Sequence, residues 1–174
     1  MKKSLFSVFA LALAVSAQSM PDAKENPIAA AGARMYTQLA NNITKSIEKM
    51  PEDKFSFRAT DDTRTFGQFV AHIADANYSY CTPVSGGTKP ASFEKGTITK
   101  ESLIAAWKGA NAECTKAWSM TTDKVLAETK KMGTREVVAA QLLFGNISHT
   151  NEHYGNLVTL MRLNHLVPPS SEGR

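Results

Sequence analysis

Apolar residues recur at three- and four-residue intervals along most of this chain, and no stretch alternates apolar and polar residues for long. Such spacing places the apolar side chains on one face of a helix, whereas a half-buried strand requires strict alternation. At 174 residues the chain is long enough for one hydrophobic core and short for two. The sequence therefore predicts an all-α fold, in the form of a single four-helix bundle.

The bundle is expected to consist of helices at residues 27–50, 65–82, 100–118 and 134–164, with a short helical piece at 123–129 and Gly133 as a breaker before the last helix. Asn26 and Pro27 have the residue types of an N-cap and a first helical position. Thr65 with Gln68 forms a capping-box pattern at the start of the second helix. We expect that helix to end before Pro83, because proline removes a backbone donor.

Residues 1–17 have the pattern of a secretory signal peptide. Lys2 and Lys3 precede an apolar run from Leu5 to Ala17 that ends in small residues. The run is shorter than the ~20 residues that a membrane-spanning helix needs, and no second such run follows. We therefore expect no stable membrane insertion once the signal is removed; an uncleaved anchor is the alternative.

The rest of the chain is expected to form a flexible leader at 18–26, the bundle at 27–167 and a polar tail at 168–174. Because a signal peptide directs export, we expect a periplasmic or secreted protein. The formal net charge of +4 includes the two lysines of the signal. The remaining positive charge is too weak to predict binding to nucleic acid.

The two cysteines constrain how the helices connect. Cysteines in an exported chain are expected to pair, and here Cys81 and Cys114 both lie near the ends of helices. Antiparallel helices would hold these sulfurs roughly 20 Å apart, too far for a disulfide. Parallel helices, with residues 83–99 crossing back over the bundle, would bring them level. The alternative is two separately buried thiols, which pack as ordinary core residues.

Three histidines share the properties of metal ligands. His149 and His153 are four residues apart on the expected inner face of the last helix, and His72 lies on the expected inner face of the second. Imidazoles bind zinc, nickel, copper and iron, and catalytic zinc sites use three protein ligands plus an open position. The alternative is three core histidines with no metal.

Four further residues near these histidines are candidates for a substrate pocket. Asp75, Tyr80 and Asn156 lie about one helical turn from a histidine, and the alternative for them, which the sequence favours, is a surface or structural role. Glu152 with its flanking histidines also spells H-x-x-E-H, a zinc-peptidase motif that requires a further acidic ligand downstream. Only the tail supplies one, so we expect Glu152 to lie at the surface or to orient an imidazole.

These histidines and their surroundings resemble the DinB-like (DinB/YfiT) superfamily of metalloenzymes. The segments that carry the resemblance are residues 69–76, 149–157 and 161–170, the last with its Pro168-Pro169 pair. The resemblance implies an up-down-down-up four-helix bundle with a long crossover between helices 2 and 3. It also implies that His72, His149 and His153 bind a divalent metal ion, with zinc or nickel expected first and iron as a further candidate.

The resemblance leads us to expect a metal-dependent hydrolase or a thiol-type transferase that acts on a small molecule of unknown identity, with a homodimer as a candidate assembly. A different class of protein also fits the sequence, namely a non-enzymatic metal-binding or stress-related bundle. A third hypothesis is a helical interaction module whose histidines belong to the core. Metal content and the effect of a chelator on stability distinguish the three.

Overall fold

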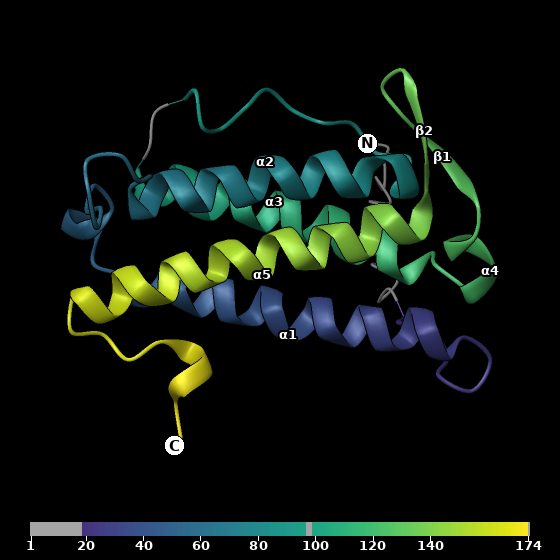
Figure 1. Ribbon diagram of the computed structural model, residues 1–174, viewed down its shortest axis with the longest axis horizontal. Coiled ribbons are helices and arrows are strands. Elements are labelled where there is room, and N and C mark those ends of the chain that lie inside the picture. Colours follow the sequence, from purple (N-terminus) through teal and green to yellow (C-terminus); the bar gives the residue numbers. More distant parts are fainter. Residues whose placement is uncertain (1–18, 97–98, 174) are drawn as a thin grey trace, which may run out of the picture.

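The computed structural model of the protein describes residues 19–96 and 99–173 (Figure 1). Its helices are α1 (Pro27–Lys49), α2 (Phe66–Ser85), α3 (Lys100–Ser119), α4 (Asp123–Leu126) and α5 (Ala139–Leu163), with single 3-10 turns at η1 (Glu52–Lys54) and η2 (Pro169–Ser171) and two short strands, β1 (Thr129–Met132) and β2 (Arg135–Val138). The predicted signal peptide lies outside the described residues. Within the described part, no helix is long and apolar enough to cross a membrane.

Four long helices form the body of the molecule, which confirms the predicted helical class. In Figure 1, α1, α2, α3 and α5 lie side by side, and α1 and α2 each contact both α3 and α5. The apolar stripes of these helices meet in one main core. Its largest fully buried side chains are Trp107, Trp118, Tyr36 and Phe66. Burial of apolar side chains, of which these rings are the largest, is the main favourable contribution to folding.

The segment between α2 and α3 runs back along the outside of the bundle (Figure 1). As a result α2 and α3 run in the same direction, and both end toward the side of the bundle where the hairpin lies. Cys81 in α2 and Cys114 in α3 are joined in a disulfide with their Cα atoms 5.0 Å apart. The predicted pairing is therefore present, and the alternative of two separate thiols does not apply.

The prediction that the last helix begins at Thr134 is wrong. Residues 129–138 instead form an antiparallel hairpin in which Met132 pairs with Arg135, and α5 begins only at Ala139. Gly133 adopts φ +63°, which a two-residue hairpin loop with glycine first requires. Each strand has four residues, too short for period-two alternation to stand out in the sequence.

Two helix ends also differ from expectation. Helix α2 continues through Pro83 to Ser85 and ends at Gly86, whose φ of +73° suits a helix end. The cost of the proline is small there, because it removes one bond close to the end of the helix. Helix α4 stops at Leu126 rather than at residue 129. The capping box of Thr65 and Gln68 is confirmed.

The expected side-chain cap at Asn26 is wrong, because a distant residue caps α1. The Asp123 carboxylate accepts hydrogen bonds from the backbone nitrogens of Ala29 (2.7 Å) and Ile28 (3.3 Å). In return, the Asn26 side-chain oxygen accepts a bond from the Asp123 nitrogen at 3.1 Å. A carboxylate suits this position, since it satisfies free N–H groups and complements the helix dipole.

The C-terminal segment folds back onto α1 and α5. The Ser170 nitrogen donates to the Tyr154 hydroxyl at 3.0 Å, and Pro169 is buried. The Lys49 ammonium pairs with the Glu172 carboxylate at 2.6 Å. The tail is therefore attached to the bundle at the end where α1 finishes.

Candidate metal centre

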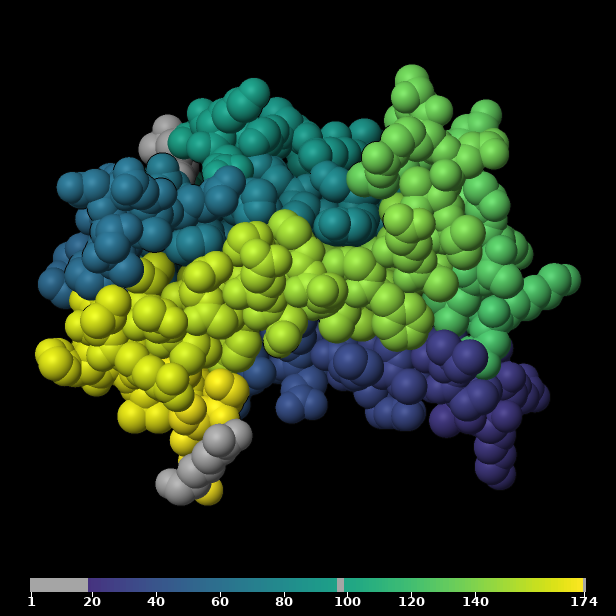
Figure 2. Space-filling model, viewed as in Figure 1, coloured from purple at the N-terminus to yellow at the C-terminus, as the bar shows by residue number. Residues whose placement is uncertain are grey.

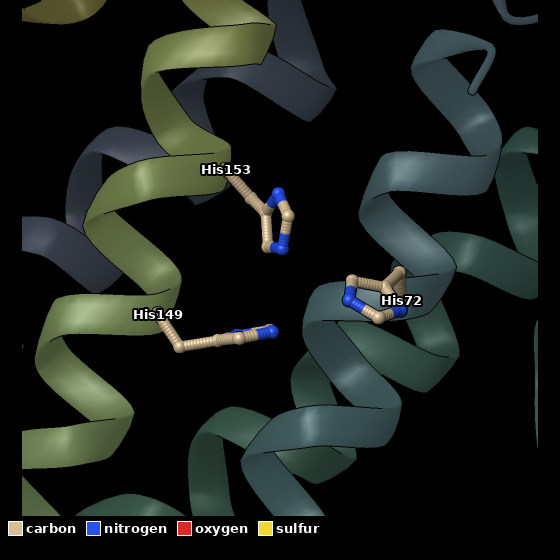
Figure 3. Close-up of side chains that lie close together, drawn as sticks. All are labelled: His72, His149 and His153. Atoms are coloured by element: carbon tan, nitrogen blue, oxygen red, sulfur yellow. The ribbon is translucent and has the colours of Figure 1, made fainter. Parts of the chain in front are cut away.

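Three imidazoles from two helices face one another inside the bundle. His72 comes from α2, and His149 and His153 come from successive turns of α5 (Figure 3). One ligand nitrogen from each ring lies within 4.8 Å of the other two. The ring centroids are 4.5 Å apart for the α5 pair, and 5.1 Å and 4.8 Å from His72 to His149 and His153. The sequence-predicted histidines thus come together in one cluster.

Burial keeps the two α5 histidines neutral. Burial lowers the pKa of His149 below its usual value, and electrostatic repulsion from the neighbouring His72 imidazole adds to this. Burial and the neighbouring imidazoles lower the pKa of His153 to about 4. Both rings are therefore uncharged near neutral pH, the form that carries a lone pair for a metal ion.

His72 is held by a residue that the sequence reading did not single out. Nδ1 of His72 lies 3.2 Å from Oε2 of Glu94, and Oε1 of Glu94 accepts a hydrogen bond from Nε of Arg64 at 2.7 Å. Although burial tends to raise the pKa of Glu94, the hydrogen bonds from Arg64 and His72 lower it on balance. A charged carboxylate at Nδ1 places the proton there and leaves Nε2 free for a ligand.

Asp75 is a predicted pocket candidate, but its carboxylate is bound to the crossover, the segment between α2 and α3. Its carboxylate accepts hydrogen bonds from Ser92 Oγ (2.6 Å) and from the backbone nitrogens of Phe93 (2.9 Å) and Glu94 (3.2 Å). Asp75 therefore anchors the segment that brings Glu94 to His72. Sequence spacing contains no sign of this contact, because Glu94 and His72 are 22 positions apart on different elements.

Asn156 and Tyr80, also predicted pocket candidates, lie against the histidines. The Asn156 amide meets Nδ1 of His153 at 3.3 Å. An amide carries both a donor and an acceptor, so it matches either tautomer of the ring. The Tyr80 ring centroid is 5.9 Å from that of His149. The two residues thus orient and flank the imidazoles.

Glu152 lies exposed on α5. Its charge raises the pKa of both neighbouring histidines, against the larger effect of burial. The peptidase motif also requires a downstream acidic ligand, but Glu172 pairs with Lys49 in the tail. Among the described residues, the group that is close enough to hold a metal contains only the three histidines.

The donor set fits a divalent transition-metal ion. Nδ1 of His149 is buried and has no hydrogen-bond partner among the described residues, which is rare for a buried polar atom. The two neutral rings of α5 and the His72 ring converge on one space, where a bound cation would satisfy their free nitrogens together. Imidazole nitrogens suit zinc, nickel, copper and iron, and three protein ligands leave a coordination position open.

A buried amide fixes how α2 and α5 align around these histidines. The Asn77 side-chain oxygen accepts hydrogen bonds from the Asn146 amide at 2.7 Å and the Thr150 hydroxyl at 3.1 Å. The Asn77 nitrogen donates to the Tyr36 hydroxyl at 3.2 Å. Sliding either helix would leave these buried groups unpaired, so the network sets the register that places His72 opposite the α5 pair.

Comparisons with known proteins agree with this architecture. The model of the DinB family matches residues 32–173. No curated protein sequence matches the chain. The chain is similar to a DinB-like protein from Bacillus cereus ATCC 10987, whose crystal structure was determined at 2.01 Å; the TM-score is 0.68 at 19% identity, over 79% of this chain and 93% of that one. That likeness shows a shared fold, and the match to the family model shows that the protein belongs to the DinB family.

Proposed function

We propose that this protein is a metal-dependent hydrolase or thiol-type transferase that holds a divalent ion on His72, His149 and His153 and acts on a small molecule. The observation that carries the proposal is the convergence of three imidazole nitrogens within 4.8 Å of one another. Zinc and nickel are the ions of choice for this donor set, with iron as a further candidate.

The chain's own residues prepare this site. Glu94 directs Nε2 of His72 toward the shared space, and Asn156 contacts Nδ1 of His153. An up-down-down-up arrangement of the bundle brings α2 and α5 together to present both sets of ligands. A bound divalent ion supplies Lewis acidity, which lowers the pKa of a coordinated water or thiol toward neutrality.

We propose an exported, periplasmic or secreted location for this activity. The buried disulfide between Cys81 and Cys114 supports an oxidising compartment, because such bonds rarely persist in the cytoplasm. The apolar run before Ala17 supports the same location.

Metal analysis of the purified protein tests the proposal. We expect about one divalent ion per wild-type chain and a large loss in His149→Ala, since each ligand contributes to a shared site. His165→Asn is the matched control, because His165 lies outside the cluster and its φ of +59° suits asparagine. Wild-type protein without a stoichiometric ion, or an unchanged content in His149→Ala, would overturn the proposal.

The non-enzymatic alternative differs in the state of the fourth position. A catalytic centre must exchange water there, whereas a storage or structural centre is saturated. Water-proton relaxation of the protein loaded with a paramagnetic ion separates these cases. We expect fast relaxation of the water protons, and we expect substrate-like thiols to suppress it. Water-proton relaxation no faster than that of a saturated site would favour the non-enzymatic metal-binding bundle.

A further inference from the structure

A cavity of about 560 Å³ opens at the far end of α2, between that helix, the crossover and the hairpin. The residues that line it and enter the argument are Ser79, Thr82, Gly87, Lys89, Lys131 and Gly133. Figure 2 shows the hairpin standing above the body of the bundle, beside the end of α2 and the crossover. Strand β1 packs on α2, so the hairpin forms one wall of the cavity.

Two lysines line this cavity and none of its lining residues is acidic, although the Glu113 carboxylate lies against Gly87. Lys89 donates to the Ser79 hydroxyl at 2.6 Å, which uses one of the three N–H groups of its ammonium. Within residues 19–96 and 99–173, neither Lys89 nor Lys131 forms an ion pair. Lys131 faces Glu136 across the hairpin in the strand register without pairing with it. Both ammonium groups thus remain available to an anion.

The cavity lies on the same helix face as the metal centre. Ser79 follows His72 by seven residues, which is two turns of α2 and a rise of roughly 10 Å. Tyr80, the residue that follows Ser79, has its ring beside that of His149. A molecule that extends along this face would reach both the three histidines and the two lysines. A cavity of this size is typical of small-molecule sites.

We propose that this cavity binds the oxyanion group, carboxylate or phosphate, of an elongated anionic substrate whose reacting end lies at the three histidines. This inference rests on the proposed function and adds the chemical class of the substrate to it. The lysines neutralise the oxyanion and hold it in the cavity. The distance between the oxyanion and the reacting group of the substrate is therefore about two helical turns.

Anion titration of the full chain, followed by NMR, tests this assignment. Inorganic phosphate and succinate are the probes, and the backbone amides of Gly87 and Gly133 report on the cavity at low ionic strength. We expect saturable shifts at both glycines. Lys89→Gln and Lys131→Gln should each weaken binding about fivefold, the loss of one charge-assisted contact. Lys108→Gln, an exposed lysine on α3, makes the same charge change outside the cavity and should leave binding unaltered.

Metal-free samples separate this proposal from the one on which it rests. The titration is repeated on wild-type protein after chelation and dialysis, and on His149→Ala. We expect the glycine shifts to persist, because the lysines and not the ion hold the probe. The cavity site would be overturned if the shifts vanished with the metal, or if both lysine variants bound the probes as tightly as wild type. Either outcome would leave the metal centre intact. If the metal analysis finds that the wild-type protein binds no stoichiometric ion, shifts that still occur would show an anion site but would overturn its role as part of an enzyme's substrate site.

Discussion

The three imidazoles of the candidate centre differ in what each meets at Nδ1. His72 meets the Glu94 carboxylate, His153 meets the Asn156 amide, and His149 meets no described partner. A carboxylate raises the basicity of the imidazole that it contacts, whereas an amide mainly orients it. His72 is therefore the ligand whose strength depends most on its neighbour.

Glu94→Gln tests this dependence. The amide keeps the shape of the side chain but loses the charge that polarises His72, and outer-shell changes of this kind cost roughly 10–100-fold in metal affinity. We expect at least a ~10-fold weaker affinity for zinc in competition with a chromophoric chelator, with an unchanged helical circular dichroism spectrum. Glu48→Gln, an exposed change on α1, is the control. Equal affinities of Glu94→Gln and wild type would rule out the polarising role.

The lowered pKa of His153 predicts how the metal-free protein responds to acid. Its pKa is about 4 in the folded protein and about 6.5 in the unfolded chain, so the unfolded chain takes up the proton first as the pH falls. The stability that this neutral ring contributes is present above about pH 6.5 and is lost between there and about pH 4. We expect the urea midpoint to drop between pH 7 and about pH 5, and to drop less in His153→Gln. An equally steep drop in that variant would contradict the assignment.

At the scale of elements, the crossover is a structural part of the site and not only a connection. Asp75 accepts three hydrogen bonds from it, and through these bonds α2 positions Glu94 over its own His72. The same segment contributes Lys89 to the cationic cavity. One anchored loop thus contributes to both ends of the proposed substrate site.

Asp75→Asn is expected to loosen this loop. Asparagine has one acceptor oxygen and no charge, and losing charged hydrogen bonds costs about 1–3 kcal/mol. We expect faster hydrogen exchange at the backbone amides of Phe93 and Glu94, together with weaker metal binding. Asp62→Asn, an exposed change before α2, should affect neither. Unchanged protection of the two amides in Asp75→Asn would show that other contacts hold the crossover.

At the scale of the whole molecule, the bundle is held by apolar burial, by the Asn77 network and by one covalent link. The disulfide joins α2 to α3 across 33 positions of sequence, the stretch that contains the crossover. A link of that span removes many conformations from the unfolded chain, because it closes a loop that is otherwise open. Its contribution therefore adds to that of the core.

Reduction should destabilise the protein by about 3–4 kcal/mol, the chain-entropy value for a loop of this length. We expect a lower urea midpoint after refolding in a phosphine reductant than after refolding without it. The Cys81→Ala/Cys114→Ala double variant is the control, since its midpoint should be low in both conditions. Wild-type midpoints that agree with and without reductant would mean that the link contributes nothing to folding stability.

Much of the fold follows from local patterns. The period of the apolar residues yields the long helices, and the Thr65 capping box is visible in the sequence as it stands. The hairpin was missed because its strands are short, although Gly133 with Thr134 is a hairpin signal. The cap at Asp123 was missed because it joins segments 94 and 95 positions apart. A local pattern cannot record a contact made across the bundle.

In the candidate site, too, some features follow from the local sequence and others only from contacts made by folding. Residue type and helical spacing were enough to select His72, His149, His153 and the cysteine pair, since chemistry and period are properties of the chain. The tertiary structure alone brought Glu94 to His72, committed Asp75 to the crossover and placed two lysines around one cavity. The physical reason is that a charged side chain takes its partner from whatever folding brings within about 3 Å, and sequence distance does not determine that partner.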